Sequence, residues 1–123
     1  MTAPALRRII LEMGTGNDLY GEDYTKAAKR AVQDALHHSS LLLFRSLDLN
    51  HEDMEVRVTI GVQHPEKVDT NAVAATLPRG NASVTARMGG LNVDHPTLGQ
   101  TNVIATAAVE AWVPITAGQF QLS

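Results

Sequence analysis

The chain begins with a short apolar run and then changes to a helical period. Residues 6–13 contain three consecutive aliphatic side chains and stop at Gly14, which favours a buried strand over a helix of several turns. From Tyr24 onward, small apolar residues recur every three or four positions, with charged and polar residues between them. They are Ala27, Ala28, Ala31, Val32, Ala35 and Leu36. This period predicts an amphipathic helix with Asp23 as its N-cap.

Three later segments show the alternation of a half-buried strand. Apolar side chains occupy every second position in residues 54–62, in residues 82–88 and in residues 102–113. A proline follows the first segment and two glycines follow the second, as is common where a strand ends. We expect the residues between the last two strands to form a loop.

The remaining segments are less regular. Asp69 can cap a short helix that runs to about Leu77. Residues 39–53 are rich in leucine but have no clear period, and we expect them to be buried, partly against a neighbouring subunit. The tail after Pro114 is expected to be frayed or to pack between subunits.

The order of these elements predicts the fold class. Strand, helix, strand, helix, strand, strand is the order of an α/β (α+β) domain, and residues 1–123 form a single such domain. Each strand–helix–strand unit should make a parallel crossover, and the last strand should be antiparallel. We therefore expect a four-stranded mixed sheet with its helices on one face.

The second face of this sheet has a mixed character. Its polar members are Glu55, Arg57, Thr59, Ser83, Thr85, Arg87, Thr106 and Glu110. Ile104, Ala108 and Trp112 lie among them. Such a face is too polar for a core and too apolar for plain solvent, so it suits a subunit interface or a cleft lined by several chains.

Composition supports self-association. Of 123 residues, 44% are hydrophobic, but there are only one Trp, two Tyr and two Phe, so the core consists mainly of aliphatic side chains. Small domains without large core residues often gain buried surface by oligomerising. We expect a homo-oligomer, and a trimer in particular.

Charge and cysteine content exclude other classes. A net charge of −3 without a basic cluster argues against binding to nucleic acid. No signal peptide or membrane span is apparent, and the absence of cysteine suits a reducing compartment. We expect a cytoplasmic protein without a membrane partner, and we expect no cofactor.

The candidate site is the glycine-containing segment before the first helix. Gly14, Gly16 and Gly21 predict a loop whose backbone amides converge at the helix N-terminus, where an anion or a carbonyl oxygen is favoured. The segment has neither the dinucleotide-binding nor the Walker A spacing. Its other candidate ligand-binding residues are Thr15, Asp18 and Tyr20.

Lys26 and Ser83 are the candidate catalytic residues. Lys26 lies in the first helical turn, where the dipole disfavours its charged form, and it is a candidate general base. Ser83, on the polar face of a strand, is its candidate nucleophilic partner. The alternative is a solvated lysine, an ordinary strand serine and glycines that merely turn the chain.

Two further groups have both a functional and a structural interpretation. Arg57 and Arg87 can bind a carboxylate, or they can pair with Glu55 and Glu110 across the subunit interface, which we favour. The acidic residues of the candidate loop and the five histidines lack convincing metal-ligand spacing, so we expect no metal site.

Three resemblances add to these inferences. The element order is similar to that of the small trimeric chorismate mutase fold, in which active sites lie between subunits. The segment GTGNDLYG, at residues 14–21, resembles the GxGxDxHG signature of a family of small bacterial and plant proteins of unassigned function. Further similarity at residues 77–80, 89–91 and 105–110 extends this likeness over nearly the whole chain. Tyr20 stands where the signature has histidine, which puts in doubt any activity that needs that histidine.

The third resemblance is short and concerns chemistry. The glycine segment together with residues 23–26 is similar to part of the ring-opening amidohydrolases, a group that includes cyanuric acid hydrolase and barbiturase. Those enzymes use Ser–Lys pairs in three related domains, so the resemblance implies hydrolysis of a cyclic amide or imide. The alternatives are a non-catalytic binding module for a small anionic metabolite and a structural trimer.

Overall fold

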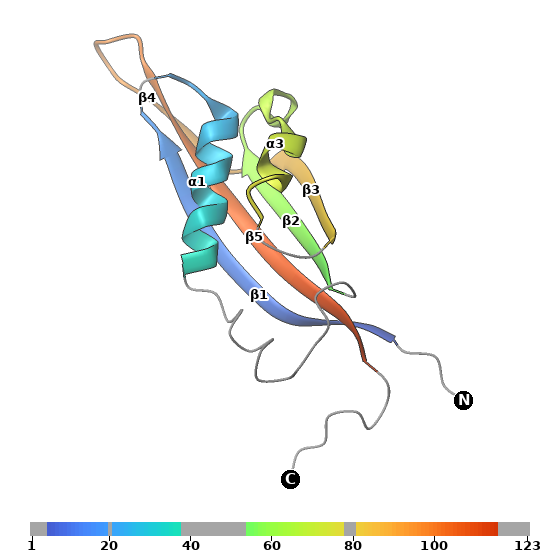
Figure 1. The fold of residues 1–123 in the computed structure, drawn as a ribbon. Helices are drawn as coiled ribbons and strands as arrows, with labels where there is room; N and C mark the ends of the chain where they lie inside the picture. Colours follow the sequence, from blue (N-terminus) through green and yellow to red (C-terminus); the bar gives the residue numbers. More distant parts are fainter. Residues whose placement is uncertain (1–4, 20, 38–53, 78–80, 116–123) are drawn as a thin grey trace.

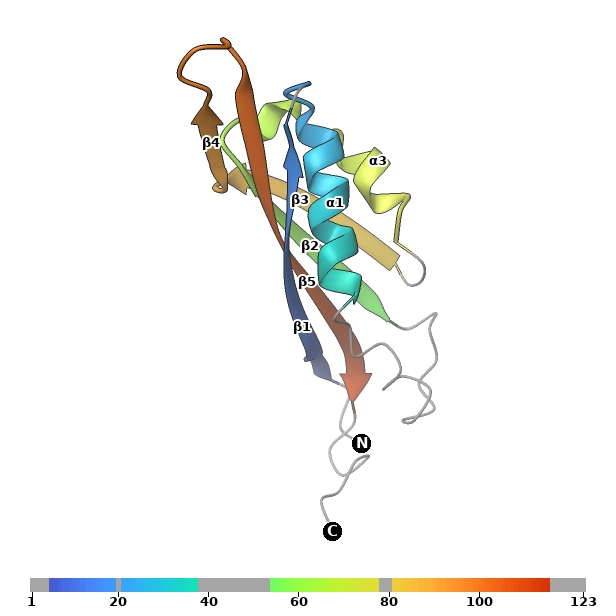
Figure 2. The same ribbon diagram turned by 90° about the vertical axis from the view of Figure 1, so that its left-hand side faces the viewer.

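The computed structural model describes residues 5–19, 21–37, 54–77 and 81–115, and these form one mixed sheet covered on one side by helices. The strands are β1 (Ala5–Asp18), β2 (Glu55–Val62), β3 (Asn81–Met88), β4 (Leu91–Asp94) and β5 (Thr101–Ile115). The helices are α1 (Tyr24–His37), the 3-10 turn η2 (Pro65–Lys67) and α3 (Thr70–Ala74). Figure 1 shows α1 and α3 in front of the sheet, and Figure 2 shows both on the same side of it.

The strand order is β1-β5-β2-β3, with β4 paired to one end of β5. β5 lies between β1 and β2 and is antiparallel to both, whereas β2 and β3 are parallel. The expected α+β class, the mixed sheet and the helices on one side are confirmed. The sheet has five strands instead of four, because Leu91–Asp94 pairs with β5 where a loop was expected.

The core lies between the sheet and α1. Alternate residues of β2 and β5, such as Val58, Ile60 and Val103, are buried against the small apolar face of α1. Alanine dominates that face, so the helix lies close to the strands beneath it. This arrangement follows directly from the alternation in the strands and the three-to-four spacing in the helix.

The helix caps are those predicted. Asp23 Oδ1 accepts a hydrogen bond from Lys26 N at 3.0 Å, and Asp69 Oδ1 accepts one from Ala72 N at 3.1 Å. Thr25 joins the two helical segments, because its hydroxyl accepts from Asp69 N at 2.8 Å. The start of α1 and the start of α3 are thereby held at the same end of the sheet.

Some expectations concern segments outside the described residues. These are the burial of residues 39–53, the tail from residue 116 onward and the turn at residues 78–80. Within the described part of the chain, no helix is long and apolar enough to cross a membrane.

Candidate functional site

The segment predicted to be a glycine loop is largely strand. Gly14 and Gly16 lie inside β1, so the expectation that residues 14–23 form a loop is wrong for residues 14–18. A Cβ on Gly14 would overlap the backbone of Ala31 and Ala35, and one on Gly16 would overlap Ala27 O. These two glycines therefore permit close packing of strand and helix and do not shape a turn. Sequence reasoning missed this because glycine suits both roles.

The turn that does precede α1 is organised by Asp18. Its side chain is 92% buried, and Oδ2 accepts hydrogen bonds from Gly21 N at 3.2 Å and from Asp23 N at 2.8 Å. Arg30 Nη1 lies 3.7 Å from Asp18 Oδ1 and also donates to Asn17 O. The backbone amides predicted to bind an external anion are thus already bonded to a carboxylate of the chain itself.

Lys26 lines a small concavity beside this turn. The hollow measures about 400 Å³ and is lined by Asp18, Leu19, Gly21, Asp23, Lys26 and Arg30. Lys26 and Arg30 supply positive charge here, and Asp18 and Asp23 offset it. Four of the predicted site residues lie together where β1 ends and α1 begins: Gly16, Asp18, Gly21 and Lys26. Tyr20 lies outside the described residues.

Ser83 lies on the other side of the sheet from Lys26. In the parallel ladder of β2 and β3 it is paired with Arg57, whose neighbours Val56 and Val58 point into the core beneath the helices. Ser83 is exposed on the face that carries Arg57. The structure therefore does not bring Ser83 and Lys26 together within one chain.

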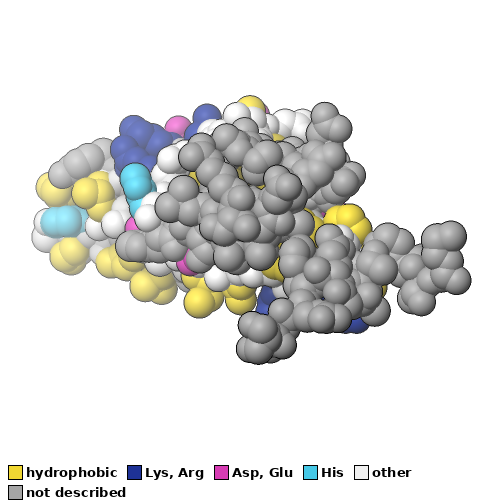
Figure 3. All heavy atoms as spheres, turned by 60° about the horizontal axis from the view of Figure 1, so that its bottom comes forward, with side chains coloured by type: hydrophobic (Ala, Val, Ile, Leu, Met, Phe, Trp, Pro, Cys, Tyr) yellow, Lys and Arg dark blue, Asp and Glu magenta, His cyan; other side chains and the backbone are white. Residues whose placement is uncertain are grey.

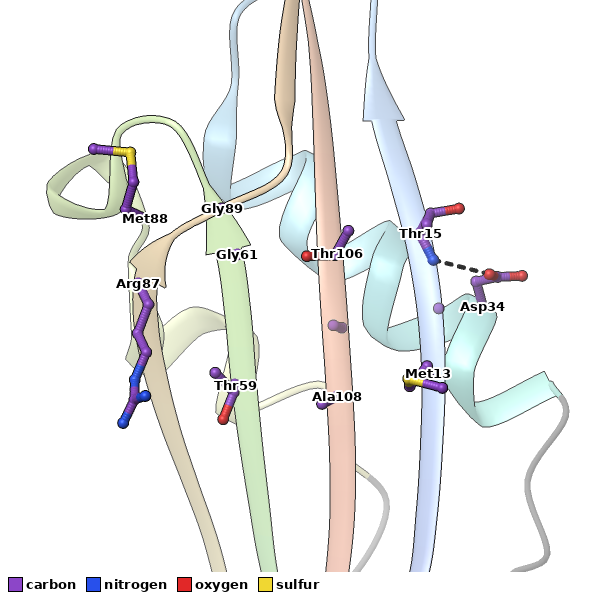
Figure 4. Close-up of a pocket in the computed structure, with 12 residues that line it drawn as sticks. Met13, Thr15, Asp34, Thr59, Gly61, Arg87, Met88, Gly89, Thr106 and Ala108 are labelled. Carbon is purple, nitrogen blue, oxygen red and sulfur yellow. Dashed lines mark hydrogen bonds between the residues drawn. The ribbon is translucent and has the colours of Figure 1, made fainter.

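The open face, meaning the sheet face opposite α1 and α3, has a shallow hollow across four strands (Figure 4). Its volume is about 600 Å³. It is lined by Met13, Gly14, Thr15, Asp34, Thr59, Gly61, Arg87, Met88, Gly89, Thr106, Ala107 and Ala108. Three of the predicted ligand-binding residues, Gly14, Thr15 and Arg87, belong to this set.

The ladder registers explain why the face is hollow there. One cross-strand row runs from Thr15 through Thr106 and Gly61 to Arg87, so small residues occupy the middle and a long one stands at the end. The next row places Met13 beside Ala108. With strands about 4.8 Å apart, the row from β1 to β3 spans about 14 Å. That length suits a small molecule lying across the strands.

Gly61 lines the bottom of the hollow and has no side chain to fill it. A Cβ on Gly61 would stand 2.6 Å from Thr106 Oγ1 and 3.4 Å from Gly89 Cα. Gly90 has a φ of +60°, and it turns the chain from β3 into β4 directly over Gly61. The alternation pattern of the sequence does not indicate that Gly89 and Gly90 pack against Gly61.

The two arginines of the open face differ in their partners. Arg57 Nε donates to Glu55 Oε1 at 3.1 Å, and its guanidinium lies 4.5 Å from the centre of the Trp112 ring. The hydrogen bond to Glu55 raises the pKa of Arg57, against a smaller opposite effect of desolvation. Within the described residues, the guanidinium of Arg87 has no hydrogen bond or ion pair. Arg57 thus pairs with Glu55 of its own chain, whereas the expected pairing across a subunit interface stays a prediction.

Glu110 takes a partner that the sequence did not indicate. Its carboxylate lies 3.3 Å from Arg8 Nη1, across the ladder of β1 and β5. The nearby Trp112 Nε1 is buried, and among the described residues it finds no acceptor. Large apolar side chains are exposed on the same face of the sheet, namely Leu11 and Met13, and Met13 is 71% exposed. The space-filling view shows such hydrophobic side chains gathered along one side of the molecule (Figure 3).

No group of three or more metal-ligating side chains exists in the described part of the chain. Glu22, one of the acids considered for a cation, takes a φ of +48° in the turn before α1 and is exposed. Asp18 and Asp23 serve the backbone of that same turn. These carboxylates are therefore accounted for by local structure.

Comparison with known proteins places the chain among proteins without an assigned activity. No curated protein matches it. A solved structure from Nostoc punctiforme PCC 73102, described as an FtsZ-like protein of unknown function, superposes with a TM-score of 0.78. The two are 35% identical, and the match covers 90% of this chain and 98% of that one. A family model described as conserved hypothetical protein (Lin0512 family) matches residues 8–111. The chain belongs to the Lin0512 family of conserved hypothetical proteins.

Proposed function

We propose that the protein binds a small anionic molecule in the hollow of its open face. The observation that carries this proposal is the guanidinium of Arg87, which has no partner among the described residues and lies at the end of a cross-strand row of two threonines and a glycine. An anionic group would be bound by Arg87, because charged hydrogen bonds to guanidinium are strong and geometrically specific. Met13 is 71% exposed, and its thioether supplies an adaptable apolar contact for the rest of the ligand.

This proposal favours binding over catalysis. The hydroxyls of Thr15, Thr59 and Thr106 are neutral hydrogen-bonding groups, and a carboxylate or imidazole base is absent from the open-face lining of β1, β2, β3 and β5 described above. Asp34 reaches the rim from α1, but its Oδ2 accepts from Thr15 N at 2.9 Å. The lining therefore offers recognition of an anion and of an apolar surface.

Hydrolysis of a cyclic amide is the alternative, and it needs two chains. Lys26 of one copy would have to reach Ser83 of another, because the sheet separates them within one chain. Turnover of succinimide by the wild type, abolished by both Lys26→Met and Ser83→Ala, would support it. Without turnover by the wild type, binding is the better account.

We further propose that copies of this chain cover part of the open face, in a threefold assembly like that of the chorismate mutase fold. The support is the half-buried Trp112, whose ring N–H has no acceptor among the described residues, with exposed Leu11 and Met13 on the same face. A second copy would bury these apolar groups and can supply the missing acceptor. Light scattering at micromolar concentration measures the assembly, and the mass of a single chain would contradict it.

The binding proposal is tested with benzoate and inorganic phosphate as probes, by thermal shift and by calorimetry. Arg87→Met keeps the aliphatic stem and removes the charge, so benzoate affinity should fall by about 1–3 kcal/mol, the worth of a charged hydrogen bond. Lys29→Met is the matched control, because it removes a positive charge from α1, which lies on the other side of the sheet and does not contribute Lys29 to the lining. Equal losses in both variants, or no probe binding to the wild type, would contradict the assignment to Arg87.

A further inference from the structure

The two edges of the sheet are protected to different degrees. On the β1 edge, the Asp34 carboxylate accepts from Thr15 N, and a register shift between Arg8 and Ile10 interrupts the ladder. Bulges and charged side chains are the usual devices that stop an edge strand from pairing with another chain. The edge formed by β1 carries both.

The edge formed by β3 lacks these devices. Its sequence, NASVTARM, contains neither proline nor lysine, and Arg87 is its one charged residue. Its ladder with β2 runs in continuous register from residue 81 to residue 88. Among the described residues β3 pairs with β2 alone, so its second side is open to another strand.

The ladder shows which backbone groups point outward from this edge. Asn81 N donates to Met54 O, and Gly89 N donates to Val62 O, so the odd-numbered residues of β3 direct their N–H groups toward β2. Backbone groups alternate along a strand, so those of Ala82, Val84 and Ala86 point away from the sheet. Their N–H and C=O groups form a regular row of donors and acceptors.

We infer that β3 pairs antiparallel with β3 of a second copy of this chain, about a twofold axis at Val84. In this register Val84 faces Val84 of the second copy, and Ala82 faces Ala86 of the second copy. All three residues direct their N–H and C=O groups outward, so each facing pair exchanges two hydrogen bonds. The two sheets then form one continuous sheet with both open faces on the same side.

Side chains fit this register on both faces. On the helix side the facing residues are alanine and valine, which are small enough for close approach. On the open face Ser83 faces Thr85 of the second copy, a pair that is favourable between strands. The two Arg87 residues stand six positions apart along the strands, about 20 Å, so their like charges do not repel. A parallel, in-register pairing would place them side by side.

The inference is independent of the proposed binding function and differs from it in stoichiometry. Pairing through β3 joins copies two by two, so the particle contains an even number of chains. A threefold assembly by itself gives three chains, and the two contacts together give six. An odd number overturns the β3 contact and leaves the proposals about the open face standing.

Proline at Ala82 tests the hydrogen bonds directly. Ala82→Pro removes an N–H that points away from β2, and proline is tolerated on an edge strand in such a position. The mass measured by light scattering should fall to half that of the wild type, with an unchanged circular dichroism spectrum. Ala82→Val keeps the N–H and is the matched control, expected to retain the wild-type mass. A natively folded Ala82→Pro variant of wild-type mass overturns the inference.

Cross-linking decides the question if the proline variant fails to fold. The chain contains no cysteine, so the double variant Ser83→Cys/Thr85→Cys introduces the only thiols. These positions face each other between copies as a non-hydrogen-bonded pair, within the range of disulfide geometry. Mild oxidation should give a covalent dimer, while Ser83→Cys alone stays monomeric on a denaturing gel. Absence of the dimer from the double variant overturns the inference.

Discussion

Gly16 of β1 lies against the backbone of Ala31 in α1, so close that a Cβ on Gly16 would overlap the Ala31 nitrogen. Gly14 makes the same kind of contact one turn further along the helix. Strand and helix thus approach each other through two glycines and a row of alanines. This contact fixes the distance between α1 and the sheet, and with it the position of the turn that follows β1.

Gly16→Ala should therefore destabilise the fold through steric overlap, since the φ of Gly16 is one that alanine can adopt. The added methyl group meets backbone, which cannot rotate away, so the helix must shift. We expect a loss of about 1–3 kcal/mol in the free energy of unfolding, typical of overpacking. Urea denaturation measures it. Asn17→Ala, on the exposed side of the same strand, is the control and should cost far less.

Asp18→Ala should destabilise the turn before α1. The change leaves the amides of Gly21 and Asp23 without their acceptor and removes the partner of Arg30. We expect a loss of about 1–3 kcal/mol in unfolding free energy, because unsatisfied partly buried donors are costly. Hydrogen exchange of the Asp23 amide should accelerate. Unchanged exchange at Asp23 would show that another group accepts this bond.

Gly61→Ala should fill the hollow of the open face. The new Cβ would lie 2.6 Å from Thr106 Oγ1, so the threonine side chain must move into the space above the floor. We expect benzoate binding to weaken at least tenfold. Thr85→Ala, in the same layer but outside the lining, is the control and should keep its affinity. Wild-type affinity in the Gly61→Ala variant would place the ligand elsewhere.

Arg57→Ala should affect assembly more than the fold of one chain. Its ion pair with Glu55 is about 40% exposed on both sides, and such pairs contribute about 1 kcal/mol or less. Its guanidinium also covers Trp112, which we propose to lie in the contact between copies. We expect a lower molecular mass at micromolar concentration and a melting temperature changed by only a few degrees. An unchanged mass would argue that this part of the face is not buried by a second copy.

The sequence by itself determined the identity and order of most elements. Alternating valines in residues 54–62 and alternating small residues in residues 102–113 can bury one face only as strands. The alanine period after Tyr24 can bury one face only as a helix. Asp23 and Asp69 marked the helix starts, because their carboxylates bond to amides only three residues away. These features depend on residues that are close together in the sequence, so they can be predicted from the sequence.

Only the tertiary structure decided the location of the candidate site. Gly14 and Gly16 were assigned to a loop because glycine permits turns, but here it permits contact with α1, a helix whose position the local sequence does not state. Asp18 was a candidate ligand-binding residue, and its burial against the amides of its own turn became visible only in three dimensions. Ser83 and Lys26 were candidate partners, and within one chain the sheet separates them. The hollow near Arg87 exists because β5 inserts between β1 and β2, which sets small residues from four strands side by side. Which distant segments pair is decided by the whole fold, so it cannot be predicted from local sequence patterns.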